Sequence, residues 1–229
     1  LKMKINDLIQ PQNELTAEEL ILKSYEIFRD KIIATSSFGT TSGVLIHLLS
    51  TLKIPVKIVY VNTGFLFKET IDYIDKLKIL YNNLEFVELH PALSREEFIK
   101  TYGNNIININ PDFCCKINKV EPLKNYLDEQ KIQAWFSGLR SEQTEFRKKL
   151  KRITLLKNGV YKILPILNWT EKEVYYYMKD NGIPFHPLYE KGYTSIGCEP
   201  CTELPDSDDE RSGRWKGKKK KECGLHTKI

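Results

Sequence analysis

Short apolar runs alternate with helix-like segments along the first half of the chain, and this alternation restricts the possible folds more than any other feature. Residues 56–61 are mostly apolar and follow Pro55, as is typical of a strand buried on both faces of a parallel sheet. Apolar residues recur at helical spacing in segments 42–52 and 68–80. Further strands are predicted at residues 31–36, 84–89 and 133–137. Strands and helices that alternate with short connections predict an α/β fold with a doubly wound, mostly parallel sheet.

The predicted strands end in small polar residues, at the edge of the sheet where ligands bind. In doubly wound sheets the binding crevice lies beyond the carboxyl ends of the strands. The turn 36–42 offers hydroxyl groups, a glycine and the amides that open the next helix, which together can hold an oxyanion. It lacks the lysine of a phosphate-binding P-loop, and by itself it is more simply a helix N-cap. The candidate ligand-binding residues at these strand ends are Ser36, Ser37, Phe38, Gly39, Thr63 and Gly64.

The length and composition suit one main domain without disulfide bonds. A chain of 229 residues with 41% hydrophobic content buries roughly 70 to 75% of the surface that its unfolded form exposes. The most apolar stretch, 43–52, contains His47 and Ser50 and is far shorter than the roughly 20 residues of a membrane span. The first residues lack the apolar run of a secretory signal. We therefore expect a cytoplasmic protein without a membrane partner, in which cysteines stay reduced.

The formal charge of +5 is modest, and much of it lies in the lysines of segment 216–221. A run of this kind is usually a solvated tail. Its position directly before Cys223 offers a second interpretation, because nearby cations lower the pKa of a thiol and attract an anionic substrate. The charge gives little support to a nucleic-acid partner, and none is expected.

The chemistry of the chain is concentrated in five cysteines, which form three groups: Cys114 with Cys115, Cys198 with Cys201, and Cys223 alone. Two close pairs can converge on one tetrahedral, sulfur-ligated metal centre. Adjacent residues reach one centre only where the backbone bends, as at a helix N-terminus after Pro111. Structural zinc is an alternative to an iron-sulfur cluster. The fifth thiol, Cys223, lies near the chain end and is a candidate nucleophile.

Seven segments follow one another in a recognisable order from about residue 30 onward. They are 36–39, 62–70, 114–123, 135–140, 192–202, 213–215 and 222–226. Together they resemble the assimilatory adenylylsulfate reductases of the phosphoadenylylsulfate reductase family. The two cysteine pairs and the terminal sequence Glu-Cys-Gly-Leu-His make the resemblance specific. It implies the sheet of the adenine-nucleotide alpha hydrolases, with loops that bind adenosine 5'-phosphosulfate.

The resemblance implies a [4Fe-4S] cluster on Cys114, Cys115, Cys198 and Cys201, because members without these pairs carry no cluster and reduce 3'-phosphoadenylylsulfate. It further implies that Cys223 attacks the sulfur of the bound phosphosulfate, expels AMP and becomes an S-sulfocysteine. A separate thioredoxin or glutaredoxin-type protein would then release sulfite. Whether the chain forms a homo-oligomer is left open.

Cations must neutralise the site before a thiolate can approach a polyanion, and guanidinium groups match phosphate and sulfate oxygens. The expected substrate-binding residues in the second half of the chain are Lys119, Arg140, Arg211, Arg214 and His226. Lys119 could instead be an exposed charge on a helix, and His226 a residue of the tail without a role. For Arg147 and Arg152, an ordinary position on the protein surface explains the residue as well as substrate binding does.

Three positions depart from the family pattern: Asn62 replaces the usual Asp, and Asn118 and Ser141 replace usual arginines. The loss of two cations near an anionic substrate would weaken binding or alter the choice of sulfonucleotide. A reductase of 3'-phosphoadenylylsulfate, or an enzyme of dual specificity, is therefore the alternative within the family.

The sequence divides into an N-terminal helical segment at 1–29, a sulfonucleotide-binding α/β domain with the cluster at 30–204, and a flexible tail with the catalytic cysteine at 205–229.

A metal-binding tRNA sulfur-transfer or adenylating enzyme shares the predicted sheet, but it needs an RNA-binding domain that we do not find in the sequence. A non-catalytic zinc protein leaves segment 36–39 and Cys223 unexplained.

Overall fold

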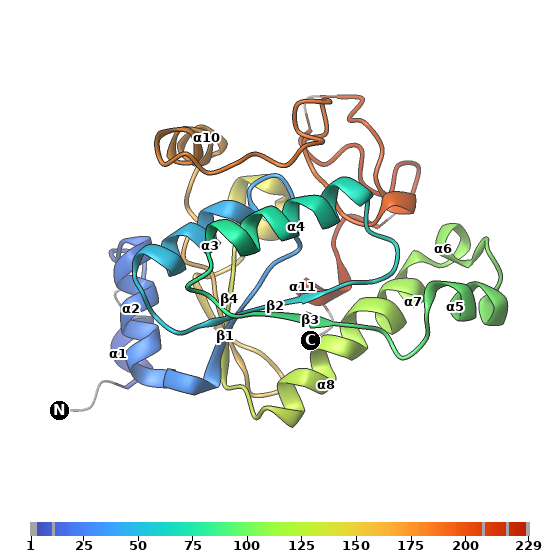
Figure 1. Cartoon of the computed structure of the whole chain (residues 1–229). Coiled ribbons are helices and arrows are strands. Elements are labelled where there is room, and N and C mark those ends of the chain that lie inside the picture. Colours follow the sequence, from blue (N-terminus) through green and yellow to red (C-terminus); the bar gives the residue numbers. More distant parts are fainter. Residues whose placement is uncertain (1–3, 11, 208, 219, 228–229) are drawn as a thin grey trace.

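A six-stranded sheet forms the centre of the computed structural model, which describes residues 4–10, 12–207, 209–218 and 220–227. The strand order is β3-β2-β1-β4-β6-β5 (Figure 1). Within the described residues, neighbouring strands pair in parallel except β5 and β6, which pair antiparallel. The strands are β1 (Ile32–Thr35), β2 (Lys57–Val61), β3 (Phe86–Leu89), β4 (Ala134–Ser137), β5 (Ile153–Leu155) and β6 (Tyr161–Ile163). The predicted mostly parallel α/β sheet is confirmed.

The central strands carry apolar side chains on both faces, which is why they pair in parallel under two helical layers. In β1, Ala34 packs into the core on one face and Ile33 into the core on the other. In β4, Phe136 packs into the core on the first face and Trp135 into the core on the second. Each of the four strands predicted from sequence is present within two residues of its expected bounds. The β5–β6 hairpin was not predicted.

Helices cover both faces of the sheet, which is the doubly wound arrangement expected from the sequence. On one face lie α2 (Ala17–Phe28), α3 (Ser42–Thr51), α4 (Lys68–Leu80) and α10 (Glu171–Asp180). On the other face α8 (Glu121–Glu129) packs through Leu123 and Leu127 against Ile33, Val59 and Trp135. Figure 1 shows α3 and α4 on one side of the strands and α8 on the opposite side.

Between β3 and β4 the chain forms a succession of short helices that leads into α8. They are α5 (Arg95–Tyr102), α6 (Ile106–Ile109), α7 (Pro111–Cys115) and the π-helix η2 (Lys116–Val120). As expected, the helix that carries the vicinal cysteines begins at Pro111, and the Asn110 side chain caps it by accepting the amide of Phe113 at 3.0 Å. Pi-helical turns are rare and often occur at functional sites, so η2 indicates that this region belongs to a functional site.

After α10 the chain is largely irregular, and parts of it close over the carboxyl ends of the strands. The remaining short elements are α1 (Asn6–Ile9), η1 (Arg29–Lys31), η3 (Ser141–Gln143), α9 (Glu145–Lys148), η4 (Glu199–Cys201) and α11 (Gly224–Thr227). Among the described residues no helix combines the length and the apolarity that crossing a membrane requires.

Candidate active site

A cleft opens at the carboxyl ends of β1, β2 and β4, where the alternating sequence predicts a binding crevice. It encloses about 1260 Å³, including its open mouth. Segment 36–39, which follows β1, lines it together with Gly138 after β4 and segment 195–197 from the irregular part of the chain. All four residues predicted in the turn after β1, Ser36, Ser37, Phe38 and Gly39, therefore face one shared cleft.

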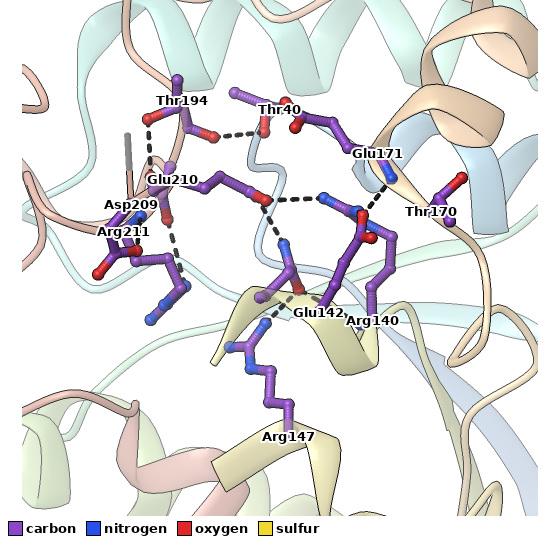
Figure 2. Close-up of polar contacts among 12 residues, drawn as sticks. Thr40, Arg140, Glu142, Arg147, Thr170, Glu171, Thr194, Asp209, Glu210 and Arg211 are labelled. Carbon is purple, nitrogen blue, oxygen red and sulfur yellow. Dashed lines mark hydrogen bonds and ion pairs between the residues drawn. The ribbon is translucent and has the colours of Figure 1, made fainter. Parts of the chain in front are cut away.

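The turn after β1 is held by local hydrogen bonds and by a buried ring. The amide of Phe38 donates to Ser36 Oγ at 3.1 Å, and Phe38 has a φ of 49°, in the left-handed region. Its ring is buried and packs edge-on against Tyr60, with 5.1 Å between ring centroids. Thr40 Oγ1 donates to the carbonyl of Thr194 at 3.0 Å (Figure 2). These contacts hold a backbone conformation that costs roughly 1 to 3 kcal/mol, as is common where a loop binds a ligand.

Basic side chains from three parts of the chain line the same cleft. They are Lys119 of η2, Arg147 of α9, and Arg211 and Arg214 of the irregular segment. Lys119, Arg211 and Arg214 were predicted to bind substrate. For Arg147 a surface position explained the residue equally well, but its side chain is buried. Arg152 is buried elsewhere, where it donates to backbone carbonyls such as that of Pro165 at 2.7 Å. The cleft is thus suited to an anionic ligand.

Lys119 lies between the cleft and the cysteines. Its side chain is only 9% exposed, so the interpretation of Lys119 as an exposed helix charge is wrong. Burial disfavours the charged form, but the neighbouring Cys198, Cys223 and Cys115 outweigh burial and raise the pKa of Lys119. Lys119 is therefore a cation that contacts both the thiols and the ligand cleft.

Trp215 provides a buried ring against which three cations pack. Arg214 lies 4.4 Å, Lys220 5.3 Å and Arg211 5.8 Å from the ring centroid. Contacts of this kind contribute about 0.5 to 2 kcal/mol each. Lys220 also forms an ion pair with Asp112 of α7, so this part of the lysine run is docked against the domain and is not a solvated tail.

Arg140 is placed differently from the other predicted cations. It is fully buried, and its guanidinium pairs with Glu142 and, at 2.9 Å, with Glu210. It is absent from the described residues that line the cleft. Gln143 donates to Glu210 at 2.8 Å and accepts a hydrogen bond from Arg147, and Figure 2 shows this network around the Glu210 carboxylate. The positive charge of Arg140 is thus already compensated by two carboxylates.

The three departures from the family pattern lie outside the cleft lining given by the described residues. Asn62 donates to Glu88 at 2.7 Å, where an aspartate would face a second carboxylate. Asn118 is buried and donates to the carbonyl of Cys114 at 3.1 Å. The amide of Ser141 donates to Leu167 O at 2.7 Å. The expectation that Asn118 removes a cation from the substrate site therefore does not fit its position beside the cysteines.

Cys114, Cys115, Cys198 and Cys201 line a second, smaller cavity of about 300 Å³. All four are free thiols. The first pair ends α7 and the second pair brackets η4, so two segments more than 80 residues apart meet here. The other lining residues are the apolar Phe65, Ile107 and Pro200 and the polar Thr63, Asn118 and Lys119. Burial raises the pKa of the Cys114 thiol to about 11.

Two polar side chains contact sulfur atoms of this cavity. Thr63 Oγ1 lies 3.3 Å from Cys198 Sγ, and Asn118 Nδ2 donates to Cys114 Sγ at 3.6 Å. Four thiols around one apolar cavity, with hydrogen-bond donors to sulfur, match the donor set of an iron-sulfur cluster. Within the described chain, however, no three His, Cys, Asp or Glu residues are arranged to hold a single metal ion.

Cys223 lies where the two cavities meet. It lines the ligand cleft and packs in the same apolar cluster as Cys114 and Cys201. A hydrogen bond with Cys115, the charge of Lys119 and the amide of Leu225 at the start of α11 lower the pKa of the Cys223 thiol. Cys223 is thus a half-buried thiol, activated toward its thiolate and directed to an anion-binding cleft.

Three further residues that were predicted to bind substrate, Thr63, Gly64 and His226, are not among the described residues that line the cleft. Thr63 lines the cysteine cavity rather than the cleft. Gly64 has a φ of 73° and forms the turn after β2, outside both described linings. The side chain of His226 lies outside the part of the chain that the structure describes.

Sequence reasoning missed two carboxylates, Glu210 and Glu222, which bind arginines of the site. One sequence feature could have indicated the role of Glu222, namely its position next to the candidate nucleophile. For Glu210 the sequence offers only its place in an acidic segment.

Comparison with known proteins places the chain among sulfonucleotide reductases. Residues 31–204 match the phosphoadenosine phosphosulfate reductase domain. The chain is 39% identical over 226 residues to an adenosine 5'-phosphosulfate reductase of Bacillus thuringiensis subsp. konkukian, covering 96% of this chain and 95% of that protein. A protein of the same name from Bacillus cereus strain B4264 is 40% identical over 206 residues, covering 89% of this chain and 87% of the relative.

Solved structures agree with these similarities. A phosphoadenylyl-sulfate reductase of Candida auris, determined as a phosphate complex, aligns with a TM-score of 0.75 and 28% identity over 89% of this chain and 99% of its own. A U34-tRNA thiolase of Methanococcus maripaludis with its [4Fe-4S] cluster aligns with a TM-score of 0.52 and 18% identity, over 75% and 65% of the two chains. The second similarity concerns the fold alone. The family match over most of the chain and the two close relatives show that the chain belongs to the phosphoadenosine phosphosulfate reductase family.

Proposed function

We propose that the protein reduces adenosine 5'-phosphosulfate to sulfite and AMP with electrons from an external thiol. One observation carries the proposal: Cys223, the thiol outside the four-cysteine cavity, opens into the cleft that the turn after β1 and four cations line. The names of the Bacillus relatives support the same substrate. A nucleophile beside cations at the carboxyl edge of a nucleotide-binding sheet is what attack on a bound sulfonucleotide requires.

In the proposed reaction the Cys223 thiolate attacks the sulfur of the phosphosulfate. A sulfur–sulfur bond forms, the bond from sulfur to the phosphate oxygen breaks, and AMP leaves with that electron pair. The enzyme then carries an S-sulfocysteine. A thiol of a thioredoxin or glutaredoxin-type protein attacks the Cys223 sulfur and sulfite leaves, after which the second thiol of the reductant resolves the mixed disulfide.

The cations of the cleft make the approach of two anions possible. Lys119 and Arg214 lie near the Cys223 sulfur and contribute to the lower pKa of its thiol. We assign to Lys119, Arg211 and Arg214 the binding of phosphate and sulfate oxygens, because guanidinium groups bind such oxygens in pairs and an ammonium group binds them as a point charge. The turn at 36–39 is assigned to the nucleotide, since it opens α3 at the edge of the sheet.

We infer that Cys114, Cys115, Cys198 and Cys201 hold a [4Fe-4S] cluster. Their four free thiols surround one apolar cavity, and structural zinc usually takes Cys-x-x-Cys knuckles from both sides, which the vicinal pair does not offer. When bound, the cluster would supply sulfide and iron charge next to Lys119 and the sulfonucleotide site. Lys119 and Cys223 both lie against the ligand cysteines, so they connect the cluster site with the cleft.

We expect adenosine 5'-phosphosulfate to be preferred over its 3'-phosphorylated form by about tenfold or more in kcat/KM. Arg140 is committed to two carboxylates, so it does not offer its guanidinium to an extra phosphate. One lost charge-assisted hydrogen bond corresponds to about 1.5 to 3 kcal/mol. The measurement is sulfite release from each nucleotide with thioredoxin as reductant. Preference for the 3'-phosphorylated nucleotide would refute this choice, and release from neither would refute the proposed function.

Gly197→Ala is expected to disable Arg214. A Cβ at Gly197 would lie 2.3 Å from Arg214 Nη2, so the guanidinium must leave its place over the loop. We expect kcat/KM to fall about tenfold or more, because this fall corresponds to the free energy of one lost hydrogen bond between Arg214 and the charged substrate. In an Arg214→Ala background the same glycine change should cost nothing further, because both changes remove one interaction. Full activity of the single variant would contradict this role of Arg214.

A further inference from the structure

The segment that ends at Cys223 is tied to the domain at both of its ends. We call residues 210–218 and 220–222 the strap. At its start Glu210 binds Arg140 at 2.9 Å and Gln143 at 2.8 Å, and Figure 2 shows the bond to Arg140. At its end Glu222 binds Arg147. The two carboxylates therefore bind neighbouring residues of one short stretch that contains η3 and α9.

The second attachment is a closely fitted ion pair. Arg147 Nε donates to Glu222 Oε1 at 3.0 Å, and Arg147 Nη2 donates to Glu222 Oε2 at 2.9 Å. Thr144 Oγ1 adds a hydrogen bond to Oε1 at 2.6 Å, and Arg211 Nη2 lies 3.9 Å from Oε2. The two side chains of the pair are only 5% and 6% exposed. We call this pair, with Thr144, the tail anchor.

The tail anchor is directly linked to the position of the thiol. Glu222 precedes Cys223 in the chain, so fixing its carboxylate limits where the Cys223 sulfur can lie. Elsewhere on the strap Lys218 donates to Asn108 at 3.0 Å, but this pair is exposed, and exposed pairs contribute little. Removing one partner from a buried, two-bond pair leaves a buried charge without its counterion and is strongly destabilising. The tail anchor is therefore a buried contact of the strap at the residue directly before Cys223.

We propose that Glu222 is a positioning residue: through the tail anchor it holds Cys223 in the cleft for attack on the sulfonucleotide. The attack rests on the function proposed above. Cys223 is only partly exposed in this arrangement, and a protein thiol must reach its sulfur after the attack. The tail anchor therefore opens during each turnover, while Glu210 keeps the start of the strap in place.

The first test needs no substrate. Trypsin cleaves after lysine, and Lys220 and Lys221 lie just before the tail anchor. We expect Glu222→Gln to increase cleavage there by about tenfold or more, because proteolysis of a folded chain follows the population of the open form. Glu145→Gln is the matched control, since Glu145 is an exposed residue of α9 that pairs only with Lys148 among the described ion pairs. Unchanged cleavage in Glu222→Gln would overturn the proposal.

The second test separates positioning from a general loss of structure. With adenosine 5'-phosphosulfate labelled in its sulfate sulfur and no reductant, Glu222→Gln should label Cys223 at least about tenfold more slowly, with nucleotide affinity close to wild type. Glu222→Asp, which keeps the charge, should recover part of the rate and remains informative if the glutamine variant folds poorly. Labelling at or above the wild-type rate in both variants would overturn the proposal. If the wild type is not labelled at all, the proposed function fails, whereas the trypsin result still tests the tail anchor.

Discussion

Replacing Cys223 by serine is expected to reduce turnover by roughly 10,000-fold or more, as losses of covalent nucleophiles commonly do. The physical reason is that a serine hydroxyl ionises far less readily than a cysteine thiol, so the variant lacks a nucleophile at this position. Sulfite release with thioredoxin measures the loss. With sulfur-labelled nucleotide and no thiol, the wild type should retain covalent label and Cys223→Ser should not.

The controls distinguish chemistry from binding. Cys223→Ser should still bind adenosine 5'-phosphosulfate, because Lys119, Arg211 and Arg214 are unchanged, and thioredoxin should release the wild-type label as sulfite. If the serine enzyme released sulfite at nearly the wild-type rate, the external thiol would be attacking the nucleotide directly. The S-sulfocysteine mechanism would then be wrong.

Cys198→Ser is expected to lose iron and activity together. Cys198 shares its cavity with three other thiols and contacts Thr63 at 3.3 Å, and three thiolates rarely retain a four-iron cluster in full. The same result is expected for Cys114, Cys115 and Cys201. Analysis of iron, acid-labile sulfide and zinc, together with the visible absorption of the purified protein, provides the measurement.

Cys223→Ser serves as the matched control here, because it removes a thiol that borders the same cysteines but is not assigned to the cluster. It should keep wild-type iron while losing turnover. A colourless, iron-free Cys198→Ser protein with full activity would rule out the cluster assignment. Zinc in place of iron in the wild type would instead favour the structural-zinc alternative.

The sheet and the approximate site could be predicted from sequence because both depend on local patterns. Apolar runs predict buried strands, and their order predicts which loops share one edge of a parallel sheet. This reasoning placed segment 36–39 in the cleft. It did not predict the β5–β6 hairpin or α6, where strands of three residues and a helix of four residues carry too little periodicity.

The partners of the charged residues could not be predicted in the same way. Arg140 was expected in the cleft and is instead buried between Glu142 and Glu210, whereas Arg147 had no favoured role and lines the cleft with Glu222 as its partner. Both missed carboxylates lie 70 or more residues away from their arginines. Sequence shows that a residue carries a charge, but not which opposite charge it meets.

The layered α/β sheet, the polar turn at its edge and the division of the cysteines into two pairs and one separate thiol can be read from residue type and spacing over short distances. Folding in three dimensions was needed to bring α7 and η4 around one cavity, to bury Lys119 between this cavity and the cleft, and to pair Glu222 with Arg147. The physical reason is that burial and ion pairing depend on distances between segments far apart in the chain, and those distances exist only once the chain has folded.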